Sequence, residues 1–102
     1  MLRPYQLFAI AAVLSATVQA DPIDCFVMAA AAEATARERD SGTPPEDAAH
    51  EVNAFATTVL KVKLNQSALG TMIDTIYDAP EVTREQVYSR VLEQCVALTV
   101  TH

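Results

Sequence analysis

Two cysteines are the residues of this sequence whose type most directly suggests chemistry. Cys25 and Cys95 lie far apart in the chain, and neither belongs to a C-x-x-C motif or has a histidine close by. Such a pair could form a disulfide, bind a metal ion, act as a redox thiol or join two chains. Because redox and metal pairs favour close spacing or a nearby histidine, the pattern favours a structural disulfide within one chain.

His50 is the second candidate for chemistry, since Glu46, Asp47 and Glu51 lie near it at helical spacings. A Glu46–His50 pair could share one helix face and hold a metal ion. The sequence lacks the second histidine of an H-E-x-x-H site, a glycine-rich phosphate loop and a G-x-S-x-G motif. Carboxylates in a first helical turn also favour the helix dipole. We therefore expect no metal, no cofactor and no enzymatic activity.

Two tyrosines, Tyr77 and Tyr88, flank a turn around Pro80. They could form an exposed aromatic anchor for a partner protein, or pack their rings at the corner between two helices, which we favour. Together with the acidic Asp47 and Glu51, they are the candidate partner-binding residues.

The first twenty residues have the pattern of a secretory signal peptide. Arg3 supplies a positive start, Leu7 to Leu14 is an unbroken apolar run, and Val18-Gln19-Ala20 resembles a cleavage site. The apolar run is shorter than the roughly 20 residues that cross a bilayer. We expect cleavage after residue 20, no membrane span in the mature chain, and a periplasmic or secreted location. That oxidising location strengthens the disulfide prediction.

The mature chain, residues 21–102, is short enough to be a single domain with a small core. The whole sequence is 51% apolar. After residue 20, however, only 82 residues remain, and alanine accounts for 13 of their 38 apolar side chains. Chains of this size are close to the lower limit for stability from burial alone. A disulfide that closes a loop of about 70 residues would stabilise the fold by roughly 4 kcal/mol.

The net charge of the sequence limits the classes of molecule that the protein can bind. The sequence has seven basic and thirteen acidic residues and a net charge of -6. Such a surface repels nucleic acid and anionic membranes, so a basic protein or peptide is the better candidate partner. The alternative is a solvated acidic surface that only keeps an exported protein soluble. A homodimer is a further alternative.

The mature chain reads as four helices. Asp21 and Pro22 suit a helix start, and Gly42 is placed to end that helix, near Asp40, in the left-handed conformation. One side of this first helix is expected to carry Ile23, Phe26, Val27, Ala30, Ala34 and Arg37.

The second helix is predicted from Pro44 to about Leu64, opened by a Thr43–Glu46 capping box. The third is predicted from Ala68 to Tyr77. The apolar positions at helical spacing are Ala48, Val52, Phe55, Ala56, Val59 and Val62 in the second helix, and Leu69, Met72, Ile73 and Ile76 in the third.

The fourth helix is predicted to begin at a Thr83–Gln86 capping box, with Val82 and Val87 as a hydrophobic staple. Its inner face is expected to carry Val87, Val91, Leu92, Cys95 and Leu98, and its last residues, 99–102, to fray.

Short connections between the helices predict an all-α, up-and-down four-helix bundle held by one disulfide. An even number of helices brings Cys25 and Cys95 to the same end. If the second and third helices were one rod, the cysteines would lie at opposite ends.

Alanines dominate the predicted first helix from Ala29 to Ala36. Small side chains permit close approach to alanines 48, 49 and 56 of the second helix. The alternative is an exposed apolar groove or dimer surface that a partner helix enters.

The signal peptide, the two cysteines, the alanine-rich helix and the turns Arg39–Pro44 and Tyr77–Pro80 resemble small exported helical proteins of proteobacteria. The resemblance implies location and fold and no activity. In size, acidity and helix content the chain is also similar to periplasmic acid-stress chaperones and to immunity proteins that neutralise toxins. We therefore expect a protein-binding function of the inhibitor or immunity kind, with an acid-stress chaperone or a structural protein without a specific ligand as alternatives.

Overall fold

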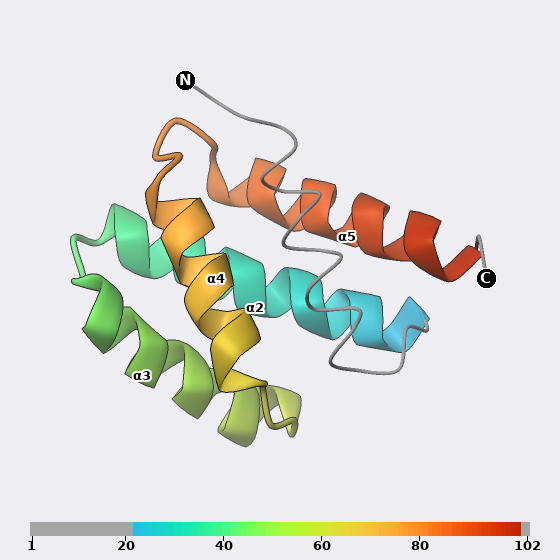
Figure 1. Ribbon diagram of the computed structural model, residues 1–102, viewed down its shortest axis with the longest axis horizontal. Coiled ribbons are helices and arrows are strands. Elements are labelled where there is room, and N and C mark those ends of the chain that lie inside the picture. The colour runs from blue at the N-terminus through green and yellow to red at the C-terminus, as the bar shows by residue number, and fades with distance from the viewer. Residues whose placement is uncertain (1–21, 101–102) are drawn as a thin grey trace.

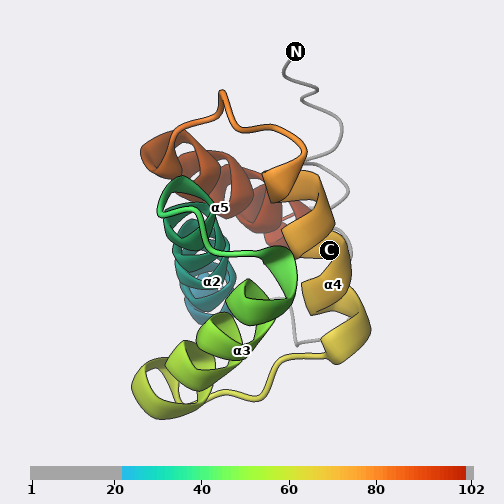
Figure 2. The ribbon, with the colours of Figure 1, turned by 90° about the vertical axis from the view of Figure 1, so that its left-hand side faces the viewer.

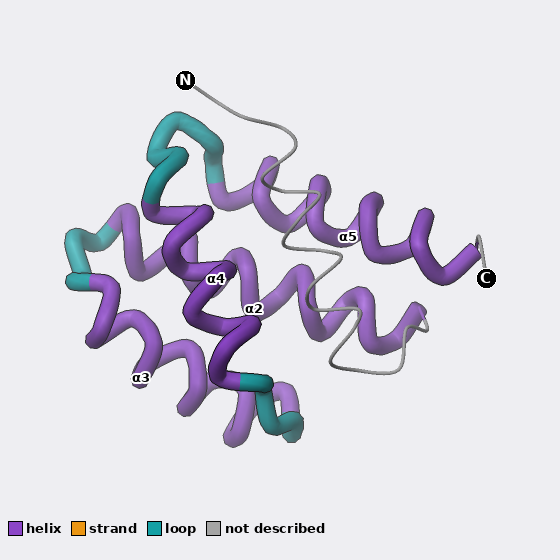
Figure 3. Tube along the Cα trace, viewed as in Figure 1, coloured by secondary structure: helices purple, strands orange, loops and turns teal. Residues whose placement is uncertain are grey.

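The computed structural model describes the backbone of residues 22–100 and the side chains of residues 25–97. It contains the helices α2 (Pro22–Asp40), α3 (Pro45–Phe55), α4 (Gln66–Tyr77) and α5 (Arg84–Val100), with a π-helical turn, η1 (Ala56–Leu60), directly after α3. This part of the chain contains no strand (Figure 3), which confirms the all-α class. The predicted signal peptide, residues 1–20, and residues 101–102 lie outside the described residues. Residues 99–100, which were also expected to fray, instead complete α5.

Helix α2 is the central element, since α3, α4 and α5 all pack against it. Helix α5 runs antiparallel beside α2 along much of its length (Figure 1). Helix α4 crosses α2 steeply, and α3 lies on the outside of the molecule (Figures 1 and 2). The four predicted helices are confirmed, while their up-and-down order stays a prediction.

The end of α2 follows the expected glycine-based stop. Gly42 has φ +82°, and its N–H donates to the Arg39 carbonyl at 3.1 Å. The Thr43 N–H donates to the Glu38 carbonyl at 3.0 Å. These two bonds form a Schellman motif, which satisfies carbonyl groups left open at the helix end.

The buried face of α2 differs from the prediction. Phe26 is 54% exposed and Arg37 is exposed, whereas most of the alanines are buried together with Cys25 and Met28. The reason is that α2 has neighbours on several sides, so its small residues, rather than its largest ones, permit close packing. The buried alanines of α2 are Ala29, Ala31, Ala32, Ala34 and Ala36. These five therefore form part of the core and line no exposed groove.

Helix α3 does not begin as predicted, at Pro44 with a Thr43–Glu46 capping box. Pro44 is extended and precedes the helix, Pro45 takes its first position, and no side chain caps the N-terminus. Thr43 cannot serve as the predicted cap because its N–H completes the Schellman motif and its hydroxyl donates to Glu38 Oε1 at 2.9 Å. Two successive prolines lack N–H groups, which reduces the need for a cap.

The predicted second helix ends earlier than expected. After Phe55 the chain forms the π turn η1, and Lys61 closes it in the left-handed conformation at φ 60°. Since π-helical hydrogen bonds join residues five apart, the turn shifts every later side chain around the axis. Val59, predicted to face the core, is consequently 62% exposed.

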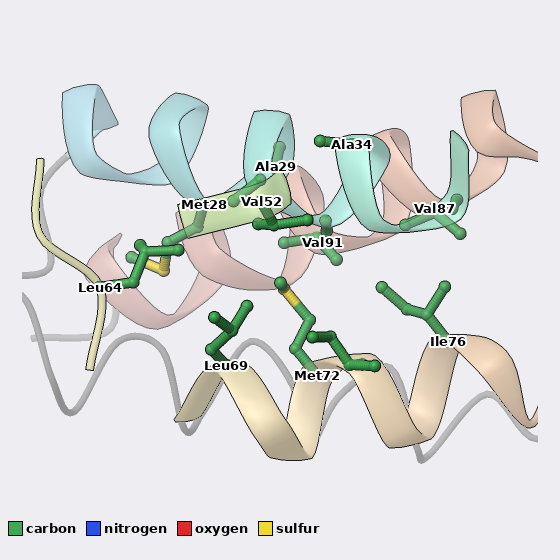
Figure 4. Packing of buried hydrophobic residues seen from close by; sticks show 14 of the residues in the cluster. Met28, Ala29, Ala34, Val52, Leu64, Leu69, Met72, Ile76, Val87 and Val91 are labelled. Atoms are coloured by element: carbon green, nitrogen blue, oxygen red, sulfur yellow. The ribbon is translucent and has the colours of Figure 1, made fainter. Parts of the chain in front are cut away.

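The third and fourth helices agree closely with their predicted faces. Leu69, Met72, Ile73 and Ile76 of α4 are all buried. Figure 4 shows Leu69, Met72 and Ile76 pointing toward α2 and α5. The start of α4 moves to Gln66, because the Asn65 side chain caps it by accepting from the Ala68 N–H at 3.0 Å.

The predicted capping box of α5 is confirmed in both directions. The Gln86 N–H donates to the Thr83 hydroxyl oxygen at 3.1 Å, and the Thr83 N–H donates to Gln86 Oε1 at 3.0 Å. Val82 and Val87 are each 1% exposed, as expected for a hydrophobic staple. Val91 and Cys95 continue the buried face, and Leu92 is half-buried against it. The side chain of Leu98, also predicted for this face, lies outside the described residues. Among the described helices, none is both long and apolar enough to cross a bilayer.

Candidate functional site

Cys25 and Cys95 form the predicted disulfide, with Cα atoms 5.5 Å apart. Both residues are fully buried, and the Met28 sulfur lies 3.9 Å from Cys95 Sγ. The bond joins the first turns of α2 to the later part of α5, as expected when four helices bring the chain back to its starting end. Its place in the core gives it a structural role.

Arg39 is a buried charged residue that the sequence did not single out. Its side chain is only 6% exposed. The guanidinium donates to the carbonyl oxygens of Ile76 and Ala79, both at 3.1 Å, and of Val82 at 2.7 Å, while Nε donates to Asp40 Oδ1 at 2.9 Å. The planar fork of arginine suits several acceptors at once. Arg39 thereby fixes the end of α4 and the turn before α5 to the end of α2.

Tyr77 joins the same corner from α4. Its hydroxyl donates to the Thr43 carbonyl at 2.6 Å, and its ring packs against the core. Burial of the phenol, followed by the Glu38 carboxylate, raises the pKa of Tyr77 above its usual value of 10.0, although Arg39 opposes this effect. The phenol therefore stays protonated at neutral pH and remains a hydrogen-bond donor.

Tyr88 lies in the second turn of α5, half-buried against the core. The structure does not present Tyr77 and Tyr88 as a pair of exposed rings, because both rings contribute to internal packing. Arg37 and Arg39 both lie in the last turn of α2, and nothing in the sequence shows which of them distant carbonyls will surround, so Arg39 was missed. The carbonyls that it binds belong to the last turn of α4 and to the proline-containing turn that follows, where carbonyl groups are no longer all used by a regular helix.

The outer face of α3 carries the remaining candidates. Glu46, Asp47, His50 and Glu51 are all exposed. No group of three or more His, Cys, Asp or Glu side chains in the described part of the chain is arranged to hold a metal ion. Within that part, Glu46, Asp47 and Glu51 have no ion-pair partner. The opposite face of α3 is anchored by the buried residues Ala48 and Val52.

No protein-family model matches the chain, and neither curated proteins nor solved structures show a significant similarity to it. The function is therefore inferred from the residues of the chain itself.

Proposed function

We propose that this chain is an exported protein, periplasmic or secreted after removal of residues 1–20, that acts by binding another protein. The outer face of α3, with the exposed carboxylates Glu46, Asp47 and Glu51, is the binding surface. The inhibitor or immunity-protein class fits such a role, because these proteins act through surface complementarity and need no catalytic group.

The observation that carries this proposal is a set of exposed carboxylates on α3 that have no ion-pair partner among the described residues. Charged groups without internal partners remain available for a basic surface on another protein, where charge complementarity speeds association and supports specificity. Arg39 and Tyr77 fix the corner from which α3 starts. A partner therefore meets a preorganised surface, which lowers the entropy cost of binding.

A capture experiment with charge-reversed baits tests the proposal. The mature, oxidised protein and its Asp47→Lys/Glu51→Lys variant are used as baits in an extract of the compartment where the protein resides. The control bait carries Glu85→Lys/Glu93→Lys on α5. Both double substitutions change the net charge equally, and each replaces one first-turn carboxylate and one further along an exposed helix. We expect a protein retained by the wild type and the control and lost by the α3 variant.

Identical sets of retained proteins on all three baits would contradict the proposal. Far-ultraviolet circular dichroism of each bait verifies that the substitutions leave the helices intact.

A further inference from the structure

The outward surface of α3 and η1 carries opposite charges at its two ends. Asp47 and Glu51 are exposed near the start of α3, while Lys61 and Lys63 are exposed just after η1. Between Glu51 and Asp74 the chain contains no carboxylate, and these two lysines are its only charged residues. None of the four side chains has an ion-pair partner within the described part of the molecule.

Ala54 lies at the centre of this surface. Asp47, Glu51 and Ala54 follow one another at intervals of four and three, which places them on one face of α3, and all are exposed. Ala54 lies midway in sequence between Asp47 and Lys61. At about 1.5 Å per residue, Asp47 lies roughly 10 Å from Ala54 along α3, and Lys61 follows Ala54 by the same number of residues.

We propose that a second copy of this chain docks on this face, with the two α3–η1 segments antiparallel. Ala54 of one copy then lies opposite Ala54 of the other, where its small side chain permits close approach. Asp47 of each copy faces Lys61 of the other, and the two-fold symmetry closes the assembly as a dimer. The inference rests on the proposed function, which makes the outer face of α3 a protein-binding surface. It identifies the protein that binds Asp47 and Glu51 as a second copy of this chain.

Charge complementarity favours a second copy over other occupants. A partner that is basic throughout would match Asp47 and Glu51 but repel Lys61 and Lys63. An antiparallel copy satisfies both signs at once, and it also covers Val59, which is 62% exposed beside Lys61. Because the pairs are at the surface, the dimer is expected to weaken as the salt concentration rises.

Sedimentation equilibrium of the mature, oxidised protein tests the charge pairing. We expect wild-type mass to increase with concentration, and the Lys61→Glu/Lys63→Glu and Asp47→Lys/Glu51→Lys variants each to dimerise at least about tenfold more weakly. An equimolar mixture of the two variants should associate again, because positions 47, 51, 61 and 63 are all acidic in one variant and all basic in the other. The matched control mixes Lys61→Glu/Lys63→Glu with Glu85→Lys/Glu93→Lys, whose α3–η1 face is unchanged. The second variant should dimerise with itself as the wild type does, and adding the first variant should give no further association.

A wild type that stays monomeric up to millimolar concentration would overturn the dimer. So would a control mixture in which Lys61→Glu/Lys63→Glu enters dimers as well as it does in the test mixture. If the protein is monomeric but capture still depends on Asp47 and Glu51, the proposed function stands and the dimer does not. If the dimer forms but no captured protein depends on Asp47 and Glu51, the dimer is supported, and the proposed binding of a different protein at this surface is rejected.

Cross-linking at the two-fold axis tests the geometry separately. An Ala54→Cys substitution should yield a disulfide-linked dimer under mild oxidation with oxidised glutathione, because a disulfide requires Cα atoms within about 7 Å. Thr71→Cys, at an exposed position of α4, is the control. Cross-linking of Ala54→Cys that is no faster than that of Thr71→Cys would rule out the antiparallel arrangement.

Discussion

Arg39 shows how one buried side chain can hold several segments together. Its guanidinium satisfies three backbone carbonyls at the end of α4 and in the following turn, with Asp40 as its counter-charge. Hydrogen bonds from charged donors contribute more than neutral ones. The Ile76 and Ala79 carbonyls also accept the N–H groups of Ala79 and Val82, so loss of Arg39 removes the charged donor while these backbone bonds remain. Arg39 is therefore the residue on which the corner between α2, α4 and α5 depends.

Replacement of Arg39 by lysine should destabilise the protein by about 2 kcal/mol, since a compact ammonium cannot reproduce the planar fork. Urea denaturation monitored by circular dichroism measures the effect. The control is Arg37→Lys, because Arg37 is exposed and its bond to Glu33 is long, at 3.5 Å. Equal stabilities for the two variants would show that the carbonyl contacts of Arg39 contribute little.

Tyr77 should make stability depend on pH in the alkaline range. Its pKa is raised in the folded state, so its contribution is complete below about pH 10, the ordinary pKa of tyrosine, and is lost as pH rises through the folded-state value. Tyr77→Phe should cost about 1 kcal/mol at pH 7 through loss of the bond to the Thr43 carbonyl. It should also flatten the decline above pH 10.

Urea denaturation between pH 7 and 11 measures the alkaline decline in the wild type, in Tyr77→Phe and in Tyr88→Phe. The Tyr88 variant is expected to keep the wild-type decline, because none of the described hydrogen bonds involves the Tyr88 hydroxyl. If Tyr77→Phe also retained that decline, the alkaline effect would have to come from other groups.

At the scale of the helices, α2 is buried through small side chains while its Phe26 faces outward. A central helix must leave room for several neighbours, and alanine combines small volume with high helix propensity. In the π turn η1, the apolar side chain of Val59 is exposed instead of buried, next in the chain to Lys61 and Lys63. Helical periodicity therefore fails in two places: in α2, which packs against several helices, and in η1, where the α-helix changes to a π-helix.

Substitution of alanine for each of the two glycines in the described chain should change the stability of the protein in opposite directions. A Cβ on either glycine would meet no atom within 4 Å, so the backbone alone decides. Gly42 has a positive φ, and Gly42→Ala should cost about 1 kcal/mol. Gly70 lies inside α4, and Gly70→Ala should stabilise the protein by about 0.5–1 kcal/mol. Thermal unfolding of the two variants checks the signs, and a shift in the same direction for both would contradict this account.

At the scale of the whole molecule, the disulfide joins the two longest helices of the chain. Cys25 and Cys95 are 70 residues apart in sequence, so the bond restricts most of the unfolded chain. The double variant Cys25→Ala/Cys95→Ala should be less stable by about 4 kcal/mol in the chain-entropy model. Urea unfolding of this variant, compared with the oxidised wild type, measures the difference. A loss below about 1 kcal/mol would show that helix packing alone holds α2 and α5 together.

Much of the fold could be predicted from local signals. The Gly42 stop, the Thr83–Gln86 capping box and the buried face of α4 follow from residues only a few positions apart, whose interactions form within one turn. The pairing of Cys25 with Cys95 followed from their number and the expected compartment. The early end of the second helix was missed, because no residue of the Ala56–Leu60 segment interrupts the helical pattern.

The sequence by itself determined the helical class, the number of helices, the disulfide and the acidic residues of the candidate surface. Only the tertiary structure decided which side of α2 is buried, that Arg39 is enclosed by carbonyls of a distant turn, and that Tyr77 bonds to the Thr43 carbonyl. The physical reason is that caps, turns and helical periodicity depend on neighbours in sequence. The burial of α2 and the partners of Arg39 and Tyr77 depend on which helices meet, and that is settled only when the whole chain packs.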